Sequence, residues 1–277
     1  MTKTLDIPFV ITQEEVSLYI QNIPPAPSVL RQTLEYLRDG DLPKAAKCAE
    51  EDPALKLYLK TLINRPIYGF RNEVSDLNQI FSILGISTTQ QILYSYLLSL
   101  LLPKQWSLFT LTDQNFYDLQ ASLGRKWEKI LKHLGLHNRD TESAITLLPA
   151  SIIVCDALFG AHAKEVAQLR SVKALDYNTI LIRLSKRSLF DLCSEIALKW
   201  EMSPSIAKIV HAASGTDSQI SGNLKLLAQW MHLLLFYELS QSAYVSAGLN
   251  EFIDFQIDFV QDIYESFMQV VDDETSR

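Results

Sequence analysis

The stretch EEDPALKLYLKTLINRPIYGF, residues 50–70, carries the pattern that decides the fold. Its large apolar residues recur at i, i+3, i+4, i+7 and i+8, which places them on one side of a helix: Leu55, Tyr58, Leu59, Leu62 and Ile63. Pro53 suits the first position of that helix, where no N–H is needed. Pro66 disfavours helical geometry at the residue before it. The sequence therefore predicts a helix over residues 53–64.

Asn64 ends this predicted helix, and it could serve as a ligand or as a cap. Asparagine tolerates the left-handed conformation of helix C-termini, and its amide can bond carbonyls that the helix leaves free. The spacing favours the cap. We expect Tyr68 and Gly69 to turn the chain next, with the tyrosine packed rather than reactive.

Helical spacing of apolar residues continues through almost the whole chain. In VSDLNQIFSILG, residues 74–85, Ser75 is the expected N-cap and Gly85 the expected stop. Alternating strand patterns are missing, and only nine glycines occur in 277 residues. We therefore expect an all-α fold. Its other helices are predicted over residues 13–21, 27–38, 42–50, 87–102, 113–134, 142–159, 188–200, 203–213, 221–246 and 251–271.

Composition restricts the class of protein further. The chain is 48% hydrophobic, which is enough for a substantial core. Its three widely spaced cysteines form neither a disulfide framework nor a CxxC motif, and they predict buried thiols in a reducing compartment. The formal net charge of −7 argues against nucleic acid. Two basic stretches, residues 125–133 and 183–188, are interpreted as solvated helix faces.

The N-terminal sequence and the longest apolar stretch both bear on location. The N-terminus has no cationic segment followed by an apolar core and a small-residue cleavage site. The apolar stretch over residues 92–103 is too short to cross a bilayer. We expect a cytoplasmic protein without membrane contact.

Three segments together resemble the HDOD domain, the HD-related output domain of bacterial signalling proteins. They are NIPPAPSVLRQTLEYLRDGD, AAKCAEEDPALKLYLKTLINRPIYG and VSDLNQIFSILGISTTQQIL. That family has a Leu-Pro-x-Leu-Pro opening, an Asp-Pro-x-Leu helix ending in Asn-Ser, a Tyr-Gly turn and a Leu-Gly stop. The corresponding residues are Pro24, Pro25, Asp52, Pro53, Asn64, Tyr68, Gly69 and Gly85. Arg65 departs from the usual serine.

The resemblance implies a multi-helix bundle of the HD-superfamily type over residues 15–215. Residues 1–14 remain as an N-terminal segment. Residues 216–277 are expected to form a C-terminal pair of long helices packed on the body. The second of these would turn an apolar band toward the protein. Its acidic stripe would face solvent, a dimer partner or a basic partner, and consists of Asp254, Asp258, Asp262 and Glu265.

Relatives with HD phosphohydrolase activity need a His-Asp dyad to hold a divalent metal that activates water. When Leu147 and Leu148 are aligned with the family's Leu-Leu, Pro149 and Ala150 replace that dyad. Neither residue can ligate a metal. His211 matches a late histidine of the family, and is expected to be a remnant or to make a hydrogen bond at the edge of the core. We expect no metal, no cofactor and no catalysis.

Other candidate groups also favour structural interpretations. Gly135 should end the helix between His133 and His137, so these two would not face the same way. His232 is expected to pack between helices, and Cys155 is surrounded by apolar residues and should be inert. Sequence motifs of serine hydrolases, phosphate-binding loops, dinucleotide sites and HExxH metalloproteases are missing.

The resemblance therefore implies a regulatory, non-catalytic protein of bacterial signal transduction that contacts signalling proteins in trans. Two alternatives stay open. One is a divergent metal-dependent phosphohydrolase with a displaced ligand set. The other is a sensor of a small ligand, such as a nucleotide, in the pocket left by the lost metal site. Homodimer formation is a further open arrangement.

Overall fold

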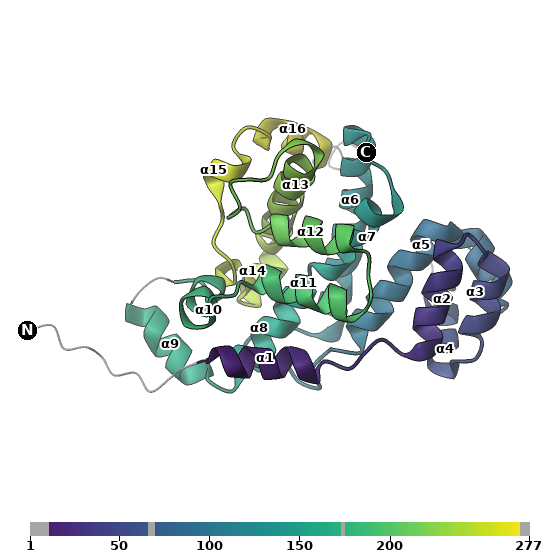
Figure 1. Cartoon of the computed structure of the whole chain (residues 1–277), viewed down its shortest axis with the longest axis horizontal. Helices are drawn as coiled ribbons and strands as arrows, with labels where there is room; N and C mark the ends of the chain where they lie inside the picture. Colours follow the sequence, from purple (N-terminus) through teal and green to yellow (C-terminus); the bar gives the residue numbers. More distant parts are fainter. Residues whose placement is uncertain (1–10, 66–69, 173–174, 272–277) are drawn as a thin grey trace, which may run out of the picture. The chain divides into compact units, whose positions relative to one another are not determined.

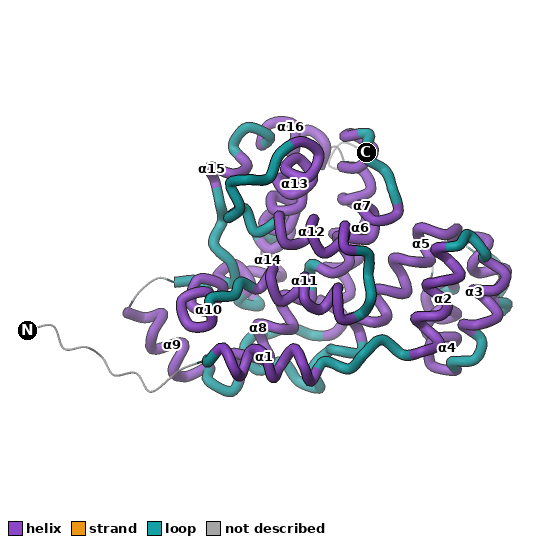
Figure 2. Tube along the Cα trace, viewed as in Figure 1, coloured by secondary structure: helices purple, strands orange, loops and turns teal. Residues whose placement is uncertain are grey.

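The computed structural model describes residues 11–65, 70–172 and 175–271, and helices make up the regular structure of these ranges (Figures 1 and 2). The predicted all-α class is confirmed, since none of the described residues lies in a strand. The helices are α1 Gln13–Asn22, α2 Ser28–Arg38, α3 Leu42–Ala49, α4 Pro53–Ile63, α5 Leu77–Ser99, α6 Asp113–Leu134, α7 Arg139–Leu147, α8 Ala150–Gly160, α9 Ala163–Val172, α10 Tyr177–Ser185, α11 Leu189–Lys199, α12 Pro204–Ala212, α13 Gly222–Leu239, α14 Ser242–Ser246, α15 Ile257–Val260 and α16 Tyr264–Val271.

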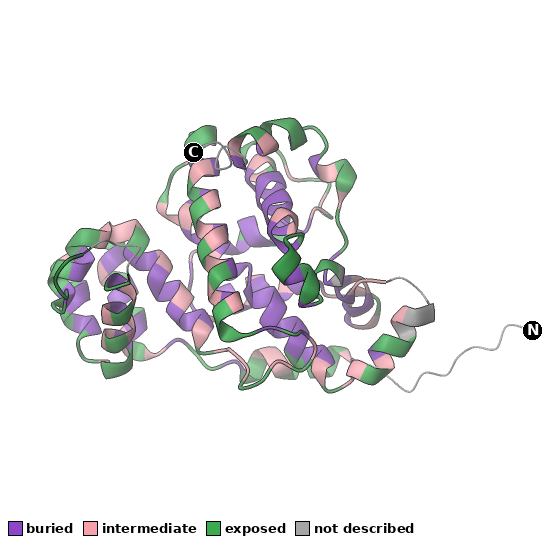
Figure 3. Cartoon of the chain, turned by 180° about the vertical axis from the view of Figure 1, so that it is seen from behind, coloured by how far each residue is buried: buried purple, intermediate pink, exposed green. Residues whose placement is uncertain are grey.

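The chain divides into two compact units. The smaller unit comprises Pro25–Leu101 with Lys199–Glu201, and the larger unit comprises the rest. In the smaller unit α2 packs on α3, and α5 contacts α2, α3 and α4. The inward sides of these helices are buried and their outward sides exposed (Figure 3). Its core includes Leu30, Leu34, Leu37, Leu55, Leu59, Ile63, Leu77, Ile80 and Phe81.

The start of α4 has the cap that its sequence indicates. The Asp52 carboxylate accepts hydrogen bonds from the backbone N–H groups of Ala54 at 2.9 Å and Leu55 at 3.1 Å. Pro53 occupies the first helical turn, where it has no bond to lose. The two prolines of the opening motif, Pro24 and Pro25, are exposed in the irregular segment between α1 and α2.

Asn64 is the C-terminal cap of α4, as predicted, and it does more than cap the helix. Its side-chain amide donates to the carbonyl of Lys60 at 2.8 Å and to the carbonyl of Val74 at 2.8 Å. The amide oxygen in turn accepts the Val74 backbone N–H at 2.8 Å. Asn64 therefore closes the loop that leads to α5. Tyr68 and Gly69, the predicted turn, lie outside the described residues.

The helix after this loop begins at a different cap from the one predicted, and its helical geometry is interrupted at Gly85, where the sequence predicted a stop. The N-cap is Asp76 rather than Ser75, because the Asp76 carboxylate accepts the Gln79 N–H at 2.8 Å. Gly85 does interrupt the helical geometry, with φ 72° and ψ 174°. The chain resumes helical geometry after Gly85, so α5 consists of two helical segments joined at a kink, at the position where the sequence predicted a helix to end.

In the larger unit, α13 is buried over most of its circumference, as its apolar sequence predicts (Figure 3). It packs on α6 and α12. Lys126 of α6 forms an ion pair with Glu238 of α13, and the exposed fractions of these two side chains are only 15% and 2%. The ammonium group also lies 5.1 Å from the centre of the Tyr237 ring.

The predicted helix over residues 251–271 is wrong as a single element. A 3₁₀ turn, Leu249–Glu251, is followed by the short helices α15 and α16. The cause is that α13 binds the backbone of this segment: Gln229 donates to the Phe259 carbonyl at 2.6 Å, and His232 accepts the Gln256 N–H at 3.1 Å. The expected continuous acidic stripe is therefore broken, although all four carboxylates are exposed: Asp254, Asp258, Asp262 and Glu265.

Three other features of the larger unit were not predicted. The expected helix over residues 142–159 is divided into α7 and α8. Helices α9 and α10 had no counterpart in the prediction. The combined span Arg139–Gly160 is long and apolar enough to cross a membrane, but 83% of its most apolar window is buried inside the protein, as in the core helix of a soluble protein.

Candidate functional site

The position expected for the metal-binding dyad is occupied by buried, apolar groups. Pro149 precedes the first residue of α8, Ala150, and both side chains are buried. Leu148 on one side and Ile152 on the other have no exposed surface. None of these side chains has an atom that can ligate a metal or donate a proton.

His211 lies on α12 and makes a hydrogen bond with a carboxylate. Its Nδ1 atom is 2.8 Å from Oδ1 of Asp191 on α11. The other carboxylate oxygen of Asp191 accepts the Ser188 N–H at 2.7 Å, so the carboxylate is fixed by the helix start. The exposed fractions of the two side chains are 48% and 31%. The imidazole is thus oriented by a carboxylate and accessible on its other side.

An ion pair joins Glu195, on α11 one turn from Asp191, to Arg187, which precedes this helix. The Arg187 Nε atom is 3.5 Å from a carboxylate oxygen of Glu195. Partial burial raises the pKa of the Glu195 carboxyl, against the opposing effect of Arg187 and with a contribution from Asp191. We refer to Arg187, Asp191, Glu195 and His211 as the α11–α12 cluster.

Sequence reasoning singled out His211 and missed its partners. Asp191 could have been recognised from the spacing Ser188-x-x-Asp191, which is typical of a helix start, but nothing local connects it with a residue twenty positions later. The two positions meet because α11 and α12 form a hairpin, in which Ser194 also donates to the Ala207 carbonyl at 2.9 Å.

His133 and His137 have separate neighbours. Helix α6 ends at Gly135 in the left-handed conformation, as predicted. His133 packs on the Trp230 ring at 5.4 Å, and His137 lies 3.4 Å from Glu142. Within the ranges that the structure describes, no three His, Cys, Asp or Glu side chains are grouped closely enough to hold a metal ion.

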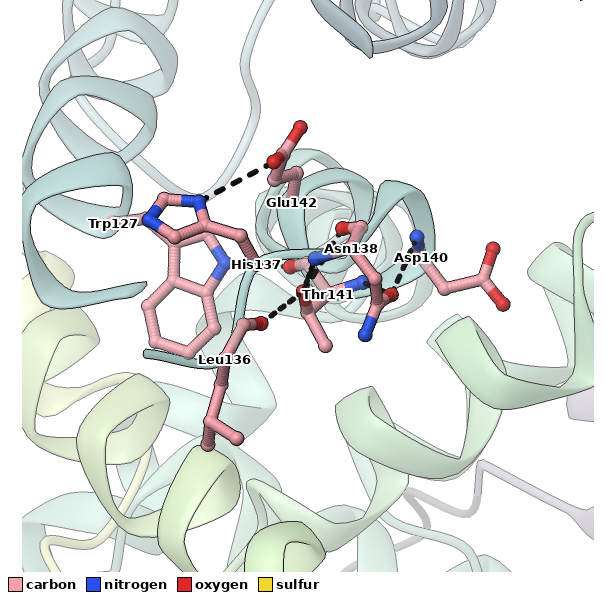
Figure 4. Close-up of polar contacts among 7 residues, drawn as sticks. All are labelled: Trp127, Leu136, His137, Asn138, Asp140, Thr141 and Glu142. Carbon is pink, nitrogen blue, oxygen red and sulfur yellow. Dashed lines mark hydrogen bonds and ion pairs between the residues drawn. The ribbon is translucent and has the colours of Figure 1, made fainter. Parts of the chain in front are cut away.

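The turn between α6 and α7 positions the segment that leads to Pro149 (Figure 4). The Trp127 indole donates to the Thr141 carbonyl at 2.7 Å, and the Thr141 hydroxyl donates to the Leu136 carbonyl at 2.8 Å. Asn138 caps α7 by accepting the Asp140 and Thr141 N–H groups. These contacts fix the start of α7 by local bonds (Figure 4).

Two of the buried thiols have pKa values unsuited to nucleophilic chemistry. Burial, with a contribution from Asp156, raises the pKa of Cys155, and burial with Asp191 raises that of Cys193. A protonated thiol is a poor nucleophile. All three cysteines, Cys48 included, are free and buried.

Asp156, next to Cys155, was not predicted to matter. Its side chain is 3% exposed, and its carboxylate accepts three consecutive backbone N–H groups from another part of the unit. The donors are Ser107 at 3.0 Å, Leu108 at 2.7 Å and Phe109 at 3.3 Å. These donors satisfy the hydrogen-bonding capacity of a buried side chain. Asp156 thus fixes the shape of the loop before α6.

Comparison with known proteins shows which family and which solved structures this protein is similar to. The sequence profile of the HDOD domain matches residues 23–215. Among curated proteins, no match is found. The solved structures below share 13–16% identity with the chain, so they establish a common fold and no more.

Three similar structures come from bacteria. An HDOD domain protein of unknown function from Geobacter sulfurreducens gives a TM-score of 0.61 at 13% identity, covering 94% of this chain and 95% of the other. A candidate phosphohydrolase from Shewanella amazonensis SB2B gives 0.63 at 13% identity, with 93% and 97% covered. A candidate signal transduction protein from Marinobacter aquaeolei VT8 gives 0.65 at 16% identity, with 95% and 64% covered.

Proposed function

The chain belongs to the HDOD family, and on that premise we propose that it is a non-catalytic regulatory protein of bacterial signal transduction. The observation that supports this most strongly is the buried, apolar pair Pro149 and Ala150 at the place of the His-Asp dyad. Without the dyad a phosphohydrolase of the HD type loses metal binding and water activation together. The remaining way for such a protein to act is through contacts.

We infer that these contacts are made in the bacterial cytoplasm with signalling proteins in trans. Free, buried cysteines fit a reducing compartment. The net charge of −7 disfavours nucleic acid and anionic membrane surfaces. The exposed carboxylates of the C-terminal segment are the partner face that we propose for a basic partner, with a homodimer as the second arrangement: Asp254, Asp258, Asp262 and Glu265.

Metal analysis of the purified protein, combined with a phosphohydrolase assay on generic phosphomonoester and phosphodiester substrates, tests the proposal. We expect far less than one equivalent of Fe, Mn, Zn or Ni per chain, and no hydrolysis above a blank after any of these metals is added. One equivalent of bound metal together with turnover would overturn the non-catalytic assignment.

One observation favours the alternative of a divergent phosphohydrolase. A histidine oriented by a carboxylate is the usual arrangement behind a metal-bound imidazole, and Asp191 orients His211 in this way. If this alternative holds, His211→Ala removes both the metal and the activity, whereas Lys208→Ala, a neighbouring exposed position of α12, leaves both intact. A small-ligand sensor at Pro149 and Ala150 has weaker support, because that site offers a ligand no polar contact.

A further inference from the structure

Half of the ten large apolar side chains that the described residues expose lie in two short stretches of the chain. They are Leu57 and Phe70 in residues 53–72, and Phe255, Ile257 and Tyr264 in residues 254–265. Leu57 is 66% exposed and Ile257 is 64% exposed, which are the two highest values of the ten. Single exposed apolar residues are normal in proteins, whereas groups of them mark interaction sites. The two stretches are therefore candidates for contact surfaces.

The first stretch is basic. Residues 53–72 contain four Lys or Arg residues and no Asp or Glu. On α4, Lys60 follows Leu57 at i+3, so its side chain lies on the same side of the helix as the exposed leucine. Lys56 precedes Leu57, and its ion pair with Glu50, at 3.7 Å, joins two partly exposed side chains and is weak. We call the following residues the α4 face: Lys56, Leu57, Lys60 and Arg65.

The second stretch is acidic and contains the partner face proposed above. Residues 226–276 contain nine Asp or Glu residues and no Lys or Arg. Because the formal net charge of the whole chain is −7, the rest of the chain carries a positive excess. Along the sequence, Ile257 lies between two carboxylates of the partner face, Asp254 and Asp258, which are both exposed. The partner face thus combines acidic groups with exposed apolar side chains.

The partner face is held in one shape by α13. The Gln229 side chain donates to the Phe259 carbonyl at 2.6 Å and to the Asp262 carboxylate at 2.9 Å. The Phe255 ring stacks on the buried His232 ring, with 5.6 Å between their centres. A surface that is ordered before it binds loses less conformational entropy on binding.

The charges of the two surfaces indicate what covers the partner face. A basic surface with an exposed apolar residue complements it, and the α4 face has both properties. The other basic stretches, residues 125–133 and 183–188, contain none of the ten exposed large apolar side chains. Identical chains are also the commonest components of soluble oligomers. One copy of the chain therefore carries a surface that suits the partner face of another.

We propose that the α4 face of one copy docks on the partner face of a second copy. Leu57 packs against Ile257, and the two lysines of α4 lie beside Asp254 and Asp258. The contact joins two different surfaces, so a pair of copies keeps one free face of each kind unless the arrangement closes. This inference rests on the proposed function, because it names the partner of the same face.

Self-association of the full chain is the first measurement. Two small faces predict a dissociation constant of about 10–100 µM, weaker than for an interface of standard size. Sedimentation velocity between about 1 µM and about 200 µM should therefore show a sedimentation coefficient that rises with concentration. Raising sodium chloride to about 0.5 M should weaken the association by about fivefold or more, because salt screens the charges of the two faces.

Two variants test which surfaces meet. Leu57→Glu places a carboxylate opposite the acidic partner face, and Ile257→Lys places a cation opposite the lysines of α4. Each change should weaken the association by about tenfold or more, because it removes an apolar contact and adds a like-charge contact. An equimolar mixture of the two variants should form a 1:1 complex, since each variant retains the face that the other lacks.

Matched controls introduce the same side chains at other exposed apolar positions. Leu18 on α1 and Leu198 on α11 are each 55% exposed. Leu18→Glu and Leu198→Lys should change the dissociation constant less than about twofold, because they alter the net charge equally but leave both faces intact. Circular dichroism of all four variants checks that they fold like the parent.

Four outcomes would overturn the proposal. The parent chain stays monomeric at about 200 µM, only one of the two face variants loses association, a control weakens association as much as a face variant does, or the mixture of the two face variants stays monomeric. None of these outcomes alters the metal and hydrolysis measurements that test the non-catalytic assignment, so the two proposals can fail separately.

Discussion

Asn64 in the smaller unit and His232 in the larger unit do the same task in opposite surroundings. Asn64 donates to the Val74 carbonyl and accepts the Val74 N–H. His232 lies 2.8 Å from the Ala213 carbonyl through Nδ1 and accepts the Gln256 N–H at 3.1 Å through Nε2. Each side chain thus holds a separate stretch of backbone by one donor and one acceptor.

We call Asn64 and His232 clamps, because each holds backbone groups by hydrogen bonds. The two clamps differ in burial. Asn64 itself is exposed, so water can replace its bond to Lys60 and, in part, its half-buried bonds to Val74 when they break. His232 has no exposed surface and is enclosed by aromatic rings, with Phe236 at 4.8 Å, Phe255 at 5.6 Å and Phe259 at 5.8 Å between ring centres. A buried polar group that loses its partner bears the full cost of desolvation. The same pair of bonds should therefore matter far more at His232.

The largest effect is expected from His232→Phe, which keeps the ring and its aromatic neighbours but leaves the Ala213 carbonyl and the Gln256 N–H unpaired. Each orphaned group costs about 1–3 kcal/mol, so the free energy of unfolding should fall by about 2–6 kcal/mol. Urea denaturation followed by circular dichroism measures this loss. A loss under about 1 kcal/mol would mean that the two backbone groups reach water, and that burial does not separate the clamps.

Acid should weaken the His232 clamp alone. Burial lowers the pKa of His232 from 6.5 to about 4, against a smaller opposing effect of the Ala213 carbonyl. The unfolded chain therefore takes up this proton first as the pH falls, so the contribution to stability is complete above pH 6.5 and is lost toward pH 4. With 1.36 kcal/mol for each unit of pKa difference, the loss is about 3 kcal/mol.

The measurement for this effect is a series of urea denaturation curves between pH 7 and pH 4, compared with His232→Phe. Because carboxylates also titrate in this range, the informative quantity is the difference between the two proteins. That difference should shrink as the pH falls. Parallel pH profiles would show that His232 keeps an ordinary pKa, and hence that it is less enclosed than the structure indicates.

The two clamps also show which hydrogen bonds of this protein could be predicted from the sequence and which could not. The cap at Asn64 follows from neighbouring residues, since Pro53 begins the helix and Pro66 forbids its extension. The partners of His232 lie 19 and 24 positions away, and no local pattern indicates them. Prediction was accurate where the bonds are local, as in α6, which was expected over the residues that it occupies.

The wrong predictions arise where the structure depends on contacts between residues far apart in the sequence. Periodicity predicts one helix over residues 251–271, and it cannot reveal that Gln229 and His232 bind the backbone of that segment. The candidate site follows this rule too. Pro149 and Ala150 were identified through the resemblance, and His211 with them, but Asp191 required the α11–α12 hairpin. The Asp156 carboxylate binds N–H groups nearly fifty positions away, beyond the reach of any local pattern.

The smallest effect is expected at Asn64. Asn64→Ala removes the bonds to the Lys60 and Val74 carbonyls and to the Val74 N–H, but water reaches this site, so the unfolding free energy should fall by about 0.5–2 kcal/mol, as for the loss of a helix cap. Asn64→Asp is the matched variant: its carboxylate can still accept the Val74 N–H, but it places an acceptor oxygen against the Lys60 and Val74 carbonyls at the end of a helix, so its stability should be no higher than that of Asn64→Ala. Neither change should alter the pH profile that belongs to His232, because a local clamp in the smaller unit shares no bond with it. If Asn64→Ala proved as costly as His232→Phe, solvent access could not be the property that separates the clamps, and the loop from Asn64 to Val74 would have to hold the smaller unit together as a whole.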